Sequence, residues 1–153
     1  MGNIINTGSS LSSSTAISIL HRNINFEDMQ TVLNNNYDTI IINTLDASKQ
    51  NCLIVGTIPI DNETKIMNEQ LQKNKNIRII IYGMNSIDDS IVRKYEQLSM
   101  LGFTEVYIYL GGLFEWLLLQ DIYGATLFPT TAIEQDLLKY KGRQQFNLRM
   151  IAF

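Results

Sequence analysis

The sequence has few of the residues that most often carry chemistry. Its 153 residues include one cysteine, one histidine and two prolines, and its formal charge is −3. A single cysteine excludes an internal disulfide framework, and the lack of a basic excess argues against nucleic acid as a partner. No apolar run is long enough to span a membrane. These absences predict a soluble, cytoplasmic protein that needs no metal and no cofactor.

Short β-branched runs alternate with amphipathic segments along most of the chain. The expected strands lie at residues 16–20, 39–43, 77–82 and 104–110, and the expected helices at 25–33, 62–73, 88–101, 113–119 and from Thr131 to just before Gly142. This alternation is typical of an α/β fold with a central, mostly parallel sheet and helices on both faces. We divide the chain into an N-terminal arm (1–15), the α/β domain (16–129), and a C-terminal helix with an apolar tail (130–153).

Three of the helices give sharper expectations about burial. The spacing of Ile87, Ile91, Tyr95 and Leu98 predicts that these four residues form one buried face. The helix at 113–119 is apolar on nearly every side, so we expect it to be buried all round, with Trp116 in the core. Thr131 and Glu134 have the spacing of a capping box, which predicts a helix start.

The junction after the strand at 77–82 is the candidate functional site. Its loop consists of Gly83, Met84, Asn85, Ser86, Ile87 and Asp88, and a helix follows directly. Unpaired backbone N–H groups and the helix dipole favour anions at such a junction. However, the loop contains no Cys, His, Lys or Arg, and Asp88 and Asp89 would themselves occupy the positive helix end and repel an anion.

The order of elements from about residue 16 to 129 resembles a rhodanese-like domain. Four segments carry the resemblance: Ile40-Ile41-Ile42-Asn43 for the family's "IDVR" strand, Val55-Gly56-Thr57-Ile58-Pro59 for "GHIPGA", Ile81-Tyr82-Gly83 for "VYC", and Leu101 to Trp116 for "LGF-x-x-VY-x-L-x-GG-x-x-x-W". Active members of that family carry sulfane sulfur as a persulfide on the first loop residue, a cysteine. Gly83 stands at that position here, and Asn43 and Leu45 replace the acid and arginine of the strand. The resemblance therefore implies a divergent member that lacks the active-site cysteine.

Two functions from different classes follow from these residues. The first is a catalytically inactive rhodanese-like module that binds a protein partner or forms a homo-oligomer through its terminal segments. The alternative is a sulfurtransferase whose nucleophile has moved to Cys52. A receptor for a small anion at the loop is a third hypothesis, which the two aspartates disfavour.

The ends of the chain lie outside the resemblance. The arm at 1–15 is polar and is expected to be flexible, and Gly2 comes near the N-myristoylation pattern except that Asn6 replaces the preferred Ser or Thr. His21 has no second ligand at a suitable spacing and is expected to be structural. The tail carries Leu148, Met150, Ile151 and Phe153, which either pack on the domain or dock on a partner. The sequence leaves both readings open.

Overall fold

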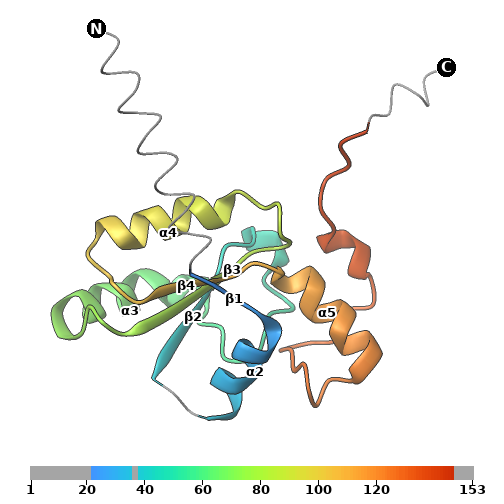
Figure 1. The fold of residues 1–153 in the computed structure, drawn as a ribbon, viewed down its shortest axis with the longest axis horizontal. Helices are drawn as coiled ribbons and strands as arrows, with labels where there is room; N and C mark the ends of the chain where they lie inside the picture. Colours follow the sequence, from blue (N-terminus) through green and yellow to red (C-terminus); the bar gives the residue numbers. More distant parts are fainter. Residues whose placement is uncertain (1–21, 36–37, 147–153) are drawn as a thin grey trace, which may run out of the picture.

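The computed structural model describes residues 22–35 and 38–146 (Figure 1). The strand expected at 16–20, His21, Gly2 and the rest of the N-terminal arm lie outside the described residues. The apolar residues of the tail, from 147 to 153, also lie outside them. The first described element of the domain is β1.

A four-stranded parallel sheet forms the centre of the domain. Its strands are β1 (Asn23–Ile24), β2 (Thr39–Asn43), β3 (Arg78–Tyr82) and β4 (Val106–Tyr109), in the spatial order β1-β4-β3-β2. Every paired strand is parallel, with Ile42 beside Ile81 and Ile81 beside Ile108. β2 and β3 each carry three consecutive buried isoleucines because both faces of the sheet are covered. The predicted α/β fold with a parallel sheet is confirmed, and the carboxyl ends of the strands meet at one edge.

Helices cover both faces of this sheet (Figure 1). The helices are α2 (Phe26–Asn34), α3 (Ile60–Lys73), α4 (Ser90–Met100) and α5 (Gly112–Tyr123), and the 3-10 turns are η1 (Ala47–Lys49) and η2 (Leu137–Tyr140). Residues of α3 and α4 pack on one face, through Met67, Ile91 and Leu98. Residues of α2 and α5 pack on the other, through Met29, Leu113 and Trp116.

Trp116 is the centre of the second core. Its side chain is 0% exposed, and it makes edge-on ring contacts with Phe128 at 5.0 Å and with Tyr109 at 6.0 Å between centroids. The indole Nε1 donates to the carbonyl of Pro129 at 3.2 Å, so the polar atom of the ring is satisfied. The prediction that Trp116 is a core residue is confirmed.

The rest of α5 corrects a sequence expectation. Residues 113–119 were expected to be buried all round, but Leu118 is 39% exposed. Beyond the expected end of the helix, Ile122 and Tyr123 are 68% and 61% exposed. The physical reason is that α5 lies in an outer layer and covers the sheet with one side only. Its opposite side therefore presents apolar residues at the surface, and the absence of a polar face does not imply complete burial.

The expected helix after Thr131 is also wrong. Only the four-residue turn η2 forms in this region, and Ile133 is 91% exposed. Thr131 Oγ1 accepts from the backbone N–H of Leu53 at 3.0 Å, so it does not cap a following turn. Glu134 accepts from Lys139 Nζ at 2.8 Å and from the N–H of Asp136 instead of reaching back to Thr131. The capping-box spacing is present, but a long-range pairing with residues 51–53 uses the threonine.

Candidate functional site

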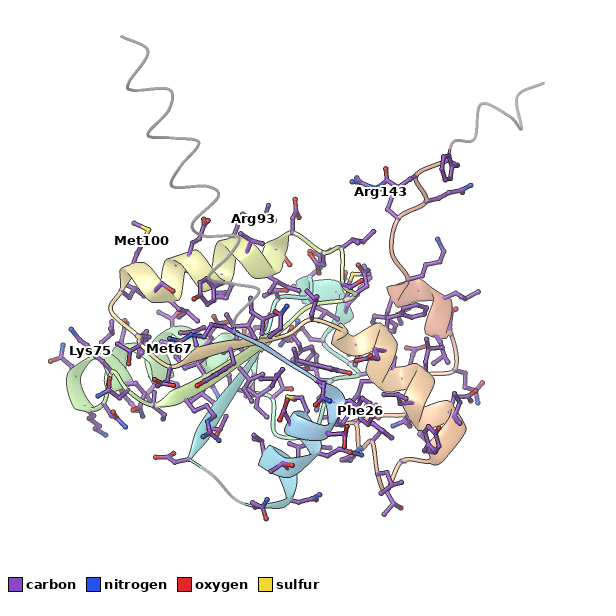
Figure 2. All side chains as sticks on the ribbon, viewed as in Figure 1. Phe26, Met67, Lys75, Arg93, Met100 and Arg143 are labelled. Atoms are coloured by element: carbon purple, nitrogen blue, oxygen red, sulfur yellow. The ribbon has the colours of Figure 1, made fainter. Side chains whose placement is uncertain are left out.

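A cavity of about 650 Å³ opens where the carboxyl ends of β2 and β3 meet the start of α4. It is lined by Thr44, Leu45, Asp46, Met84, Asn85, Ile87, Asp88, Asp89, Ser90, Arg93, Lys141, Gly142 and Arg143. Figure 2 shows Arg93 on α4 and Arg143 on the C-terminal segment at this side of the molecule. The structure therefore brings together four of the six predicted loop residues at this cavity and adds a C-terminal segment that sequence reasoning did not place there.

Gly83 is buried at the first position of the loop, directly after β3. A Cβ atom added there would lie 2.7 Å from Asp88 Oδ2, 2.9 Å from Thr44 Oγ1 and 3.0 Å from Ile91 Cγ1. Separations below 3.0 Å are essentially never found for real Cβ atoms. The space that a side chain at position 83 would enter is therefore already filled by other side chains.

The Asp88 carboxylate occupies the interior of the loop. Its Oδ2 accepts from the N–H of Met84 at 3.0 Å, and its Oδ1 accepts from the N–H of Ser90 at 3.0 Å. Ser90 Oγ donates to the same Oδ1 at 2.6 Å and is hydrogen-bonded to Thr44 Oγ1 at 2.7 Å. A negative charge thus already holds the position between loop and helix that favours an anion.

Asp89 behaves differently from its neighbour. Its carboxylate is 85% exposed and lies 3.7 Å from Arg93 NH1 on the next turn of α4. An ion pair so exposed contributes little to stability. Of the two aspartates singled out from the sequence, only Asp88 fills the loop.

Asn85 joins the loop to the C-terminal segment. The residue is 8% exposed; its Nδ2 donates to the carbonyl of Tyr140 at 3.0 Å and its Oδ1 accepts from the N–H of Ile87 at 3.1 Å. Ile87 was expected on the buried face of the helix, but it is 58% exposed because α4 begins only at Ser90 and helical spacing does not apply before it. Ile87 instead lies against Gly142, where an added Cβ would be 2.9 Å from Ile87 Cδ1.

The turn after β4 packs against the same loop. The first N–H groups of α5, from Leu113 and Phe114, donate to the carbonyls of Gly83 and Met84 at 2.9 and 2.8 Å. Gly112 has a φ of +68°, and a Cβ there would be 2.7 Å from the carbonyl oxygen of Gly83. These N–H groups of α5 are therefore directed at the loop backbone.

In the first turn of α5, Glu115 accepts a hydrogen bond from the hydroxyl of Tyr109 at 2.5 Å. Burial, and then the nearby carboxylate, raise the pKa of Tyr109 far above its ordinary value. Tyr109 therefore stays a neutral donor that fixes Glu115 at the start of α5.

At the end of β2, Asn43 stands where the family resemblance places an acid. It is 3% exposed and forms a reciprocal amide pair with Gln50: its Nδ2 donates to Gln50 Oε1 at 3.1 Å, and its Oδ1 accepts from Gln50 Nε2 at 2.7 Å. Sequence reasoning missed Gln50, because a lone glutamine in a polar loop gives no pairing signal. The neutral pair holds the loop after β2 without introducing a charge.

Cys52 lies in the core, away from the solvent. Its side chain is 2% exposed, and Sγ donates to the carbonyl of Ala132 at 3.4 Å. Burial raises the pKa of the thiol above its ordinary value, which lowers the fraction of reactive thiolate at neutral pH. The environment is that of a packing cysteine.

Neither a metal centre nor a membrane span is found in the part of the chain that the structure describes. Among residues 22–35 and 38–146, no three His, Cys, Asp or Glu side chains are grouped so that they could hold a metal ion. In the same residues, no helix combines the length and the apolar character needed to cross a bilayer.

Part of the chain is similar to a known protein family. The family model described as rhodanese-like domain matches residues 48–119, which include the whole loop. Residues 48–119 of this chain are therefore similar to the rhodanese-like domain family. No curated protein matches the chain.

Solved structures give the same fold. The BH2092 protein of Bacillus halodurans is 19% identical, with a TM-score of 0.54 over 71% of this chain and 80% of that chain. The Alr3790 protein of Anabaena is 22% identical, with a TM-score of 0.53 over 77% of this chain and 100% of that chain. A thiosulfate sulfurtransferase of Pseudomonas aeruginosa is 16% identical, with a TM-score of 0.53 over 77% of this chain and 23% of that chain. Identities this low establish the rhodanese-like fold alone.

Proposed function

We propose that this chain is a catalytically inactive rhodanese-like protein that acts as a binding or structural module in an assembly. One observation supports this proposal above all others: the first loop residue is Gly83, and the space beside it is taken by the Asp88 carboxylate. Glycine has no atom that can accept sulfur or attack phosphate. Position 83 thus has neither a nucleophile nor free space for one.

The surroundings of the loop support the same proposal. The three hydrogen bonds to Asp88 come from the loop and from α4, so the groups that would otherwise stabilise a bound anion have an internal partner. An incoming anion would also meet the negative charge of this carboxylate. Binding of a protein partner is therefore assigned to surfaces outside the loop, with the terminal segments as the first candidates.

A sulfur-transfer assay with thiosulfate as donor and cyanide as acceptor tests the first half of the proposal. We expect the purified protein to form thiocyanate at the rate of the protein-free control. The matched variant is Cys52→Ser, which removes the sole thiol. Activity above background that disappears in Cys52→Ser would reject the inactive module in favour of the alternative, a sulfurtransferase with Cys52 as nucleophile.

Deletion of residues 143–153 tests the second half. The described part of this segment, from Arg143 to Phe146, is exposed, and Phe146 is 87% exposed. We expect the truncated protein to unfold at the same denaturant concentration as the full chain and to lose self-association measured by light scattering and sedimentation. A destabilised truncation of a chain that is monomeric throughout would assign the tail to the core and contradict docking through this end.

A further inference from the structure

Position 83 is restricted to glycine by its neighbours and not by its backbone. Gly83 is not among the glycines whose φ lies in the left-handed region, so another residue could adopt its backbone conformation. The obstacle is space, because an added Cβ would lie 2.7 Å from Asp88 Oδ2 and 2.9 Å from Thr44 Oγ1. The closer of these two atoms belongs to the only charged group inside the loop.

Asp88 cannot turn away without leaving polar groups unpaired. Its two oxygens accept from the N–H groups of Met84 and Ser90, both at 3.0 Å, and from Ser90 Oγ at 2.6 Å. Hydrogen bonds to a carboxylate are stronger than those between neutral groups. Rotation of the side chain would forfeit all three bonds and leave partly buried donors without acceptors.

We infer that Gly83 and Asp88 form a coupled pair: the inward carboxylate of Asp88 closes the loop and makes the closest of the contacts that disfavour a side chain at position 83. This deepens the proposed function, on which it rests, because it explains how the loop is held shut as well as why it is inert. The pair keeps the interior of the strand-to-helix junction filled. Returning a nucleophile to position 83 is then not sufficient to return reactivity.

The coupling also has an electrostatic component. A thiol introduced by Gly83→Cys would begin with its Cβ 2.7 Å from Asp88 Oδ2. A like charge so near disfavours the thiolate and raises the pKa of a thiol. The reactivity of a thiol at position 83 should therefore depend on whether residue 88 carries a carboxylate.

A double-mutant cycle in the full chain tests the steric part of the coupling. Gly83→Ala alone should lower the midpoint of thermal unfolding. Asp88→Ser shortens the neighbouring side chain and leaves one oxygen that can accept from Ser90 in a short turn. In the double variant, Gly83→Ala should therefore cost much less than it does alone. Additive losses, or a double variant that fails to fold, would overturn the inference.

The control for this cycle is Asp89→Ser. It removes a carboxylate from the same helix start, but one that is 85% exposed and pairs with Arg93 on the next turn of α4. We expect Asp89→Ser to leave the loss caused by Gly83→Ala unchanged. Equal rescue by Asp88→Ser and Asp89→Ser would show that the charge of the helix end is responsible, and would overturn the pair.

Alkylation by iodoacetamide at pH 8 tests the electrostatic part. All variants carry Cys52→Ser, so that the thiol at position 83 is the only one. Adding Asp88→Ser to Gly83→Cys should accelerate alkylation by about tenfold or more, which corresponds to about one pKa unit. Equal rates would overturn the inference. Neither readout uses sulfur transfer, so activity of the wild-type protein with thiosulfate would reject the proposed function and leave the pair standing.

Discussion

Two neighbouring strand-to-helix turns of this domain use glycine for different reasons. The turn after β3 begins with Gly83 and the turn after β4 contains Gly112, and the strands before them lie side by side, with Tyr82 next to Tyr109. At Gly83, side chains take up the space that a Cβ would enter. At Gly112, the backbone has a φ of +68°, and the nearest atom to an added Cβ is the carbonyl oxygen of Gly83 itself.

Whether a glycine is restricted by side chains or by backbone decides which of the two turns can accept a substitution. A conflict with a side chain is relieved by shortening that side chain, as proposed for Gly83 and Asp88. A conflict with the backbone has no such remedy, because the carbonyl is part of every residue. The turn after β4 is thus a fixed support, and the turn after β3 is the part whose chemistry can change while the fold persists.

The largest effect should come from removing the core that supports the fixed turn. Trp116→Ala should lower the free energy of unfolding by about 3–5 kcal/mol, because a fully buried aromatic ring is replaced by a cavity. The control is Leu118→Ala in the same helix, where 39% of the side chain is exposed and the loss should be much smaller. Urea unfolding of both variants checks the prediction, and similar losses would mean that α5 is not anchored by its inner side.

The next effect tests the fixed turn directly. Gly112→Ala should cost about 2–4 kcal/mol, since left-handed strain adds to a contact of 2.7 Å with the loop backbone. Gly102→Ala is the control: its φ is +104°, but the nearest atom to an added Cβ is 3.5 Å away, in the side chain of Lys75.

The control should cost about 1–2 kcal/mol from backbone conformation alone. The two losses are measured by denaturant unfolding under the same conditions. If they are equal, close packing of the turn against the loop makes no contribution, and the contrast between the two turns fails.

Sequence patterns were sufficient for the parts of the fold that depend on local periodicity. The isoleucine runs predicted β2 and β3, and the helix expected at 25–33 forms as α2, where Asn25 and Asp28 make a reciprocal capping box. The apolar face of α4 was correct from Ile91 onward. These features are set by neighbours a few residues apart, which a single sequence displays.

The errors occurred where distant residues decide the outcome. Thr131 has the spacing of a capping residue, but Leu53, far away in the sequence, binds its side chain. The contact of Asn85 with Tyr140 likewise joins residues far apart in the sequence, and the Asn43–Gln50 pair depends on the path of the loop between them. At the loop, the sequence identified Gly83 and Asp88 separately, but their 2.7 Å relation appears only in three dimensions.

The smallest effect concerns Cys52, which belongs to neither of the two turns. Burial raises the pKa of the folded thiol, so the unfolded chain loses this proton first as the pH rises. The unfolded state then binds fewer protons, and the stabilisation is complete below the ordinary thiol pKa of about 8.5 and is lost above it. The stability advantage of the wild type over Cys52→Ala should therefore shrink between pH 7 and pH 10 in urea unfolding. A gap that widens with pH would mean that the folded protein favours the thiolate, as a relocated nucleophile at Cys52 requires.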